Sequence, residues 1–303
     1  MCAIVAHLFG RFAMYSDQQK VPDLEGKEEE LLGYLLVHRA RPHPRESLAS
    51  LLWSESTTSQ SRKYLRQALW HLHQALEIRR GLPANAVIEV EHDWVQINRN
   101  ASIQIDIAEF ERASAQADRK PAVPDEAVAE TLKKAVELYR GDFLEGSYQD
   151  WCLFERERLQ NIYLSMLDKL MLYSIEHREF EGGREFGTTI LRYDRASERT
   201  HRQLMKLYYL SGDRTAALRQ YQRCVAALDE ELGVKPDHAT QVLYEAIRAD
   251  KDFLGSTPVA APAASLPEVV TRLKRLHTFL GQTKRRIRRE IAAVEGTLRT
   301  TKE

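Results

Sequence analysis

The amino-acid sequence predicts a mainly α-helical protein with a mixed α+β region at its N-terminus, an all-α region behind it and a C-terminal helix. Three observations support this prediction. Short β-prone runs are confined to the first 110 residues, apolar residues recur at helical spacing almost throughout the chain after residue 106, and the helical region contains an internal repeat. A length of 303 residues exceeds the ~100–200 of one typical domain. We therefore divide the chain into domains of 1–110 and 111–254, a flexible linker of 255–267 and a basic amphipathic helix of 268–303.

The N-terminal region begins with two β-prone runs, 3–9 and 11–15, which Gly10 separates. Two helical segments with apolar stripes follow, at 31–36 and 48–53. A longer helix is expected over roughly 58–80, with Thr58 or Ser59 as its N-cap. Its apolar stripe consists of Leu65, Leu69, Leu72 and Leu76.

A β-hairpin is predicted behind this long helix. The runs 87–90 and 94–97 alternate apolar and polar residues, and His92-Asp93 is a candidate two-residue turn between them. Strands, three helices and a terminal hairpin in this order are typical of a winged helix-turn-helix.

The helical region repeats itself with a period of 34 residues, which is the period of tetratricopeptide helix pairs. Tyr163–Ala196 aligns with Ser197–Glu230. The second copy has small residues where helices must approach closely. The first copy has glycines at positions where alanine or an aromatic residue is expected to pack better: Gly182, Gly183 and Gly187.

The aromatic residues ahead of this repeat are expected to form helix–helix core, because burial is their commonest use. They are Tyr139, Phe143, Trp151 and Phe154. Arg156 and Arg158 are interpreted as a solvated or ion-paired face.

The C-terminal segment combines near-heptad apolar spacing with a basic cluster. The spacing over 268–303 suggests a coiled-coil-like helix or a helix docked in a groove. The cluster consists of Lys284, Arg285, Arg286, Arg288 and Arg289. It could contact DNA phosphates or an acidic protein partner, and it could equally be a solubilising face.

The formal net charge is zero, with 44 basic and 44 acidic side chains, but the charge is unevenly distributed. Residues 1–110 have a net charge of −2, residues 111–254 of −4 and residues 265–303 of +6. Overall neutrality therefore does not exclude nucleic-acid binding, since a local basic surface is sufficient.

Several functional classes are excluded. No phosphate-binding, dinucleotide-binding, zinc-protease or serine-hydrolase motif is present, so we expect no enzyme activity, no cofactor and no metal. No apolar run reaches the ~18 residues of a membrane span, and the N-terminus does not resemble a signal peptide. Three widely spaced cysteines favour the reducing cytoplasm.

Five stretches together resemble one family. They are LLGYLLVHRARPHPRESLASLLW (31–53), SRKYLRQALWHLHQAL (61–76), IDIAEFERA (105–113), LYRGDFLEGSYQDWCLFERERL (138–159) and SGDRTAALRQYQRCVAALDEELGVKPDHATQVLYEAI (211–247). In this order and spacing they are similar to the antibiotic regulatory proteins of the SARP type, which combine an OmpR-like winged helix with a bacterial transcriptional activation domain. The resemblance implies a DNA-binding transcription activator whose helical domain supports dimerisation and contacts with RNA polymerase. It does not cover residues 255–303.

Within the resemblance, the helix at 59–80 is the candidate DNA-reading element. Its exposed flanks present arginine, lysine and glutamine, the side chains suited to guanine, phosphate and adenine. The candidate contacts on it are Ser61, Arg62, Lys63, Arg66, Gln67 and Trp70. A solvated face of an ordinary amphipathic helix would have the same composition.

The hairpin is the candidate wing. Asp93 at its tip is a poor phosphate partner, and the missing charge could come from Arg79, Arg80 and Arg99. Glu28–Glu30 also stand where the family often has basic residues, which places DNA contact by that helix start in doubt.

The sequence therefore predicts a cytoplasmic activator that binds promoter repeats through helix 59–80 as a homodimer and recruits RNA polymerase. Its expected partners are double-stranded DNA and RNA polymerase, with a possible protein partner for the C-terminal helix and no membrane. The alternative is a tetratricopeptide-like signalling adaptor or scaffold whose winged helix binds protein rather than DNA.

Overall fold

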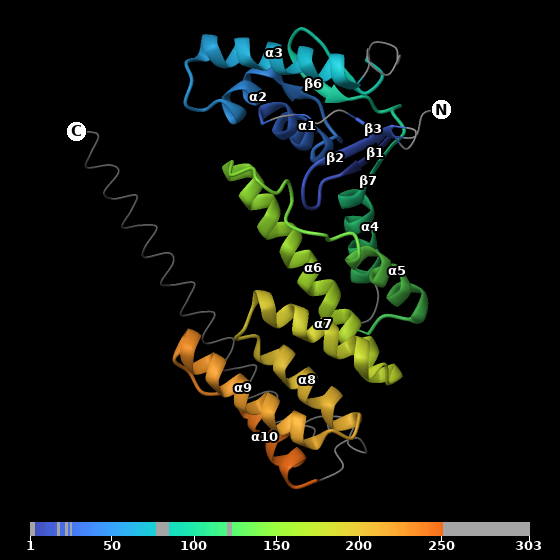
Figure 1. Cartoon of the computed structure of the whole chain (residues 1–303), viewed down its shortest axis with the longest axis vertical. Coiled ribbons are helices and arrows are strands. Elements are labelled where there is room, and N and C mark those ends of the chain that lie inside the picture. The colour runs from blue at the N-terminus through green and yellow to red at the C-terminus, as the bar shows by residue number, and fades with distance from the viewer. Residues whose placement is uncertain are drawn as a thin grey trace, which may run out of the picture. The chain divides into compact units, whose positions relative to one another are not determined.

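The structure, a computed structural model, describes residues 4–16, 19–21, 24, 26–76, 85–119 and 123–250 (Figure 1). The predicted C-terminal helix and its basic cluster lie outside these residues. The strands are β1 (Ile4–His7), β2 (Ala13–Ser16), β3 (Gln19–Lys20), β4 (His43–Pro44), β5 (Ile88–Val90), β6 (Trp94–Ile97) and β7 (Ile103–Ile105). The helices are α1 (Lys27–Val37), α2 (Arg45–Leu52), α3 (Thr58–Leu76), α4 (Asp106–Asp118), α5 (Glu126–Val136), α6 (Asp150–His177), α7 (Phe180–Tyr193), α8 (Glu198–Leu210), α9 (Arg214–Leu232) and α10 (His238–Arg248). The predicted mainly α fold is confirmed.

The N-terminal region is a winged helix with two small sheets. One sheet has the order β3-β2-β1-β7, in which β1 pairs antiparallel with β2 and parallel with β7. The other has the order β4-β6-β5. The predicted hairpin is confirmed, because Val90 pairs with Val95 and the Glu91 N–H donates to the Trp94 carbonyl across His92 and Asp93.

Helix α3 packs its predicted leucine stripe into the core, where Leu65, Leu69 and Leu72 are each less than a tenth exposed. It begins at Thr58, so Thr57 rather than Thr58 or Ser59 is the residue before it. The Ser61 N–H donates to the Thr57 carbonyl, and the Thr57 N–H donates to the Gln60 side chain at 3.4 Å. The Thr57 hydroxyl also donates to the Gln60 side chain at 3.1 Å, so Gln60 accepts from both the amide and the hydroxyl of the residue that precedes the helix.

The winged helix joins the helical region through β7 and α4. The Asp106 carboxylate at the start of α4 accepts the backbone N–H groups of Leu8 and Phe9, at 2.8 and 3.1 Å, and that of Ile107. Burial raises the pKa of this carboxyl although the three donors favour its charged form. Asp106 therefore ties the end of β1 to the first turn of α4.

A second connection is made by the loop between α5 and α6. Phe143 forms a β-bridge with Phe9, and the N–H groups of Leu144 and Glu145 donate to the carbonyls of Leu8 and Gly10, each at 2.9 Å. Phe9, Phe110 and Phe143 belong to one hydrophobic core. Residues 1–247 accordingly form a single compact unit.

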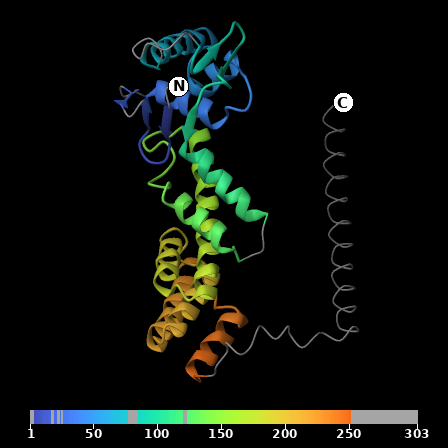
Figure 2. The ribbon, with the colours of Figure 1, turned by 90° about the vertical axis from the view of Figure 1, so that its right-hand side faces the viewer.

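The predicted helical repeat is present. Helix α9 begins 34 residues after α7, and the pairs α6–α7 and α8–α9 pack antiparallel (Figures 1 and 2). The Asp213 side chain caps α9 by accepting the Ala216 N–H at 2.8 Å. Helices α4 and α5 pack beside α6 ahead of the repeat (Figure 2).

The expectation that larger residues would pack better at the glycines of the first copy is wrong for two of them. A Cβ on Gly187 would lie 2.7 Å from Leu204 and Met171, and one on Gly183 would lie 2.9 Å from Leu207 and Ser174. The helices approach so closely here that a methyl group would force the neighbouring side chains to shift. At Gly182 the nearest atom to a Cβ is at 3.9 Å, so that position has room.

Two further expectations fail on α6. Tyr139, Phe143 and Trp151 are buried as predicted, but Phe154 is 72% exposed because it lies on the outer face of the helix. Arg156 is not part of a solvated or ion-paired face, since its guanidinium donates to backbone carbonyls of the loop before α6. Arg158 is ion-paired as expected, with Glu111 and Glu155.

Candidate nucleic-acid interface

The solvent face of α3 presents most of the predicted contact residues. Helical spacing places Arg62, Arg66 and Trp70 on one line and Lys63 and Gln67 on the neighbouring line. All five side chains are exposed, and Trp70 is 58% exposed. An aromatic residue this exposed on a helix with a buried leucine stripe is available for contact with a partner.

Ser61 does not join this face. Its side chain is 3% exposed, and its hydroxyl donates to the carbonyls of Thr57 and Thr58 at 3.1 and 3.2 Å. Position 61 lies four residues before Leu65, so it shares the core-facing side of α3. Its role is therefore in the first turn of the helix, and the structure does not support it as a base or phosphate contact.

A groove runs between α3, the start of α2 and the hairpin tip. Its basic groups are Arg45 from α2 and Arg62 and Arg66 from α3, and the hairpin contributes His92 and Asp93. Arg45 anchors this arrangement, because its N–H donates to the Asp93 carbonyl at 3.0 Å and its guanidinium donates to the Glu91 carbonyl at 3.1 Å. The hairpin tip is thus held beside the start of α2.

Sequence reasoning missed Arg45. The signal was a basic residue directly after the breaker RPHP, in the first turn of a predicted helix. No sequence pattern around Arg45 indicates that it lies near Arg66. The two residues are 21 positions apart and come together only because α2 packs against α3.

Besides Asp93, a carboxylate of α2 lies among these arginines. Glu46 on α2 forms an ion pair with Arg62. Both side chains are more than half exposed, so water screens the pair strongly. No carboxylate pairs with Lys63 or Arg66 in the part of the chain that the structure describes, which leaves two cations of α3 free for an anionic partner.

The hairpin tip carries no basic side chain apart from His92. His92 Nδ1 lies 2.6 Å from the Asp93 carboxylate, and both side chains are almost fully exposed. Arg99 is exposed but follows the other end of β6, about 13 Å along the strand from the tip. Arg79 and Arg80 lie outside the described residues, so their assignment stays a prediction.

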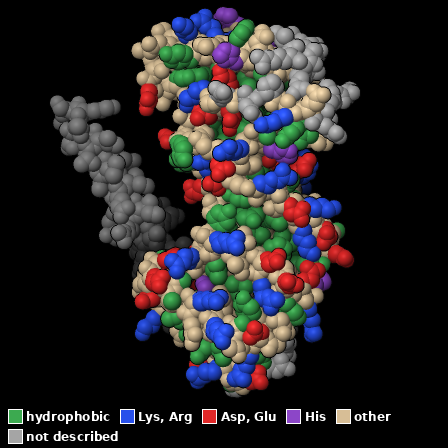
Figure 3. Space-filling view, viewed as in Figure 1, with side chains coloured by type: hydrophobic (Ala, Val, Ile, Leu, Met, Phe, Trp, Pro, Cys, Tyr) green, Lys and Arg blue, Asp and Glu red, His purple; other side chains and the backbone are tan. Residues whose placement is uncertain are grey.

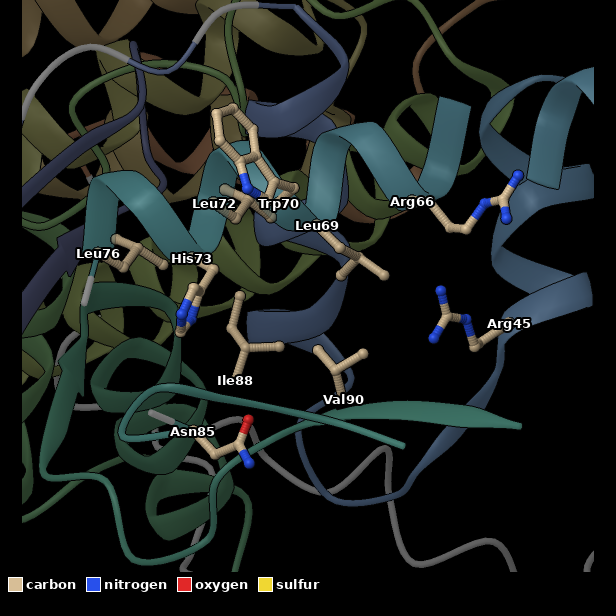
Figure 4. A pocket seen from close by; sticks show the side chains of 10 residues that line it. All are labelled: Arg45, Arg66, Leu69, Trp70, Leu72, His73, Leu76, Asn85, Ile88 and Val90. Carbon is tan, nitrogen blue, oxygen red and sulfur yellow. The ribbon is translucent and has the colours of Figure 1, made fainter. Parts of the chain in front are cut away.

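Along its second half, α3 faces β5 across an apolar cleft (Figure 4). Leu69 and His73 point from α3 toward Ile88 and Val90 of β5, and Arg45 and Arg66 lie together at one end of the cleft (Figure 4). The cationic end of the cleft is continuous with the groove, because Arg45 and Arg66 line both.

The acidic start of α1 has internal partners. Glu28 lies 2.8 Å from His71 of α3, and Glu30 accepts Lys27 at 2.7 Å and the Ser147 hydroxyl at 2.8 Å. These carboxylates hold α1 against α3 and against the loop before α6.

Within the described ranges, no group of three or more histidine, cysteine or acidic residues is arranged to hold a metal ion. None of the helices described combines the length and the apolar character needed to cross a membrane.

Comparison with known proteins agrees with this architecture. Residues 105–248 match the family model of the bacterial transcriptional activator domain. The chain is 23% identical over 241 residues to regulatory protein AfsR of Streptomyces coelicolor, an alignment that covers 79% of this chain and 24% of AfsR. The chain thus spans about a quarter of the length of that relative.

A solved structure shares the fold. The structure of Mycobacterium tuberculosis EmbR in complex with a low-affinity phosphopeptide superposes with a TM-score of 0.66 at 22% sequence identity, covering 82% of this chain and 66% of that chain. At this identity the likeness shows a shared fold, and residues 105–248 behind the winged helix match the bacterial transcriptional activator domain.

Proposed function

We propose that this protein is a sequence-specific activator that binds promoter DNA through the solvent face of α3 and recruits RNA polymerase, with the helical domain supporting a homodimer. The observation that carries the DNA proposal is the exposed set of Arg62, Lys63, Arg66 and Gln67 on the third helix of a winged helix. Arginine and lysine bind guanine and phosphate, and glutamine binds adenine.

The groove supplies the positioning contacts. Arg45 at the start of α2 lines the same groove as Arg62 and Arg66, so we infer that it contacts a phosphate beside the major groove when α3 enters it. On the face of the helical region that Figure 3 shows, basic and acidic side chains are interspersed over α7 to α10. DNA contact is therefore assigned to the winged helix.

A chain with so few unpaired cations on its reading face needs more than one copy for a tight complex. Each neutralised phosphate contributes a slope of about −0.9 to the dependence of log K on log salt. Two copies on promoter repeats about 34–36 Å apart double the number of contacts on one face of the duplex. This is the reason for proposing a homodimer on repeated sites.

The test is a gel shift with the chain's own upstream region at several salt concentrations. Arg62→Ala combined with Lys63→Ala should weaken binding and reduce the salt slope. Arg219→Ala, an exposed arginine on α9, is the matched control and should change neither. Thermal melting establishes that each variant is folded.

Unchanged affinity and an unchanged slope in the double variant would reject α3 as the reading helix. Absence of any DNA binding by the wild-type chain would favour the adaptor alternative, in which the winged helix binds protein. The wing-tip carboxylate of Asp93 is the feature that this alternative explains better.

A further inference from the structure

The apolar cleft between α3 and β5 has a volume of about 260 Å³ (Figure 4). Strand β5 is an edge strand of the sheet β4-β6-β5, and its residues Ile88 and Val90 lie opposite Leu69 of α3. Being two positions apart on one strand, Ile88 and Val90 face the same side of the sheet. Leu69 and Ile88 are only 6% and 5% exposed, so the cleft is narrow and its walls are shielded from bulk water.

The size and the walls of the cleft suit one aromatic ring with a short polar extension. An apolar cavity of about 150 Å³ stays dry and binds benzene, so a cleft of about 260 Å³ leaves room beyond the ring. The side chains of Leu69, Ile88 and Val90 offer water no hydrogen bond. Replacement of water by an apolar group is therefore favourable here.

One end of the cleft is cationic. The guanidinium groups of Arg45 and Arg66 lie together there, whereas His73 and Asn85 lie away from that end (Figure 4). Arg45 uses a guanidinium N–H to hold the Glu91 carbonyl at 3.1 Å, which fixes the group and leaves further donors available. Within the described ranges, no carboxylate or carbonyl pairs with Arg66, and no acidic side chain lines the cleft.

The two features together select one class of ligand. A carboxylate is planar and has two oxygens, which match the fork of a guanidinium group. An inorganic anion would pair with the arginines but leave the apolar walls facing water. A neutral ring would cover the walls but leave two like charges side by side without a counter-ion. A small aromatic carboxylate satisfies both ends.

We propose that this cleft binds a small aromatic carboxylate, with the carboxylate on Arg45 and Arg66 and the ring between α3 and β5. Both arginines also line the groove proposed to contact DNA. A bound carboxylate occupies their donors and adds negative charge beside the duplex, so it weakens DNA binding. This effect on DNA rests on the proposed function, whereas ligand binding itself does not. By linkage, DNA lowers the affinity for the carboxylate by the same factor.

The first test is isothermal titration calorimetry of the full-length chain, without DNA, with benzoate, phenylpropionate and naphthoate. At least one should bind with a dissociation constant of about 1 mM or tighter, the range that ligands of this size permit. The amide of the same acid keeps its shape without the charge, and acetate keeps the charge without the ring. Both should bind about tenfold more weakly or worse. No binding by any of the three acids, or equal binding by acid and amide, would overturn the proposal.

Two variants locate the bound carboxylate. Arg66→Ala removes one anchor, and Val90→Phe fills the cleft with a ring while it retains both arginines. Each should weaken binding of the carboxylate about tenfold or more. Arg219→Ala on α9 and Val242→Phe on α10 make comparable changes at exposed positions and should keep the wild-type affinity. Thermal melting establishes that each variant is folded, and wild-type affinity in folded Arg66→Ala would contradict the assignment.

The effect on DNA is measured by a gel shift at constant ionic strength. The carboxylate that binds best should weaken DNA binding of the wild type, and its amide should not. Val90→Phe should bind DNA like the wild type and should not respond to the carboxylate. Weaker DNA binding by Val90→Phe without ligand would instead make the cleft part of the DNA interface and overturn the regulatory role. If the wild type binds no DNA, the proposed function fails, and calorimetry still decides whether the cleft binds a carboxylate.

Discussion

The rings of Tyr34 and Trp151 meet edge-on, at an interplanar angle of 90° and a centroid distance of 5.2 Å. Tyr34 belongs to α1 of the winged helix and Trp151 to the first turn of α6. Phe143 contacts the same indole at 5.7 Å. These aromatic contacts join the winged helix and the helical region in one core, so the two should unfold together.

Trp151→Ala is expected to destabilise the protein by about 3–5 kcal/mol, because it removes a large buried ring and leaves a cavity at this junction. Trp151→Phe is the control and should cost much less, since the indole N–H has no acceptor among the described residues. Urea unfolding followed by circular dichroism measures both. Equal losses for the two variants would contradict the packing argument.

Gly187→Ala should destabilise the protein by about 1–3 kcal/mol, because the new methyl group would overlap Leu204 of α8 and Met171 of α6. Gly182→Ala, on the same helix, meets only Phe186 at 3.9 Å and should instead stabilise by about 0.5–1 kcal/mol through helix propensity. Thermal melting of the two variants distinguishes the effect of close packing on stability from the effect of helix propensity. A stabilising Gly187→Ala would show that the Leu204 and Met171 side chains can shift at no cost.

The buried imidazole of His201 should make stability fall as pH drops from 7.5 to 5.5. Nδ1 accepts from Gln220 and Nε2 lies against the Arg195 carbonyl, so the neutral ring is fully satisfied. Burial lowers the pKa of His201 below 6.5, and it does the same for His38. Below pH 6.5 the unfolded chain then binds more protons than the folded one, which favours unfolding.

His201→Gln should flatten this pH dependence, and adding His38→Gln should flatten it further. Urea unfolding at the two pH values provides the measurement. A slope unchanged in the double variant would place the pH sensitivity elsewhere.

Glu46→Gln should strengthen DNA binding about three- to fivefold at low salt, because it frees Arg62 from its surface ion pair and removes a negative charge from the groove. Glu185→Gln on α7 is the control. A gel shift over a salt series gives affinity and slope together. Weaker binding to the specific site alone would mean that Glu46 orients Arg62 toward a base.

The sequence by itself determined the order and type of the helices and of four strands, because these follow from local periodicity, whereas it did not predict the short strands β3, β4 and β7. The leucine spacing of α3, the two-residue turn at His92-Asp93 and the 34-residue repeat are each readable within a short window, and all three are present in the structure. The exposed cations of α3 followed from the same spacing, since a helix with one apolar stripe must turn its other residues outward.

Only the tertiary structure decided which neighbours these residues have. It buried Ser61 and exposed Phe154, engaged Arg156 with backbone carbonyls and placed Arg45 beside Arg66. It also paired β1 with β7 across the whole winged helix and left no room for a methyl group at Gly187. Each of these depends on contacts between residues far apart in the chain, and periodicity within one helix carries no information about what packs against it.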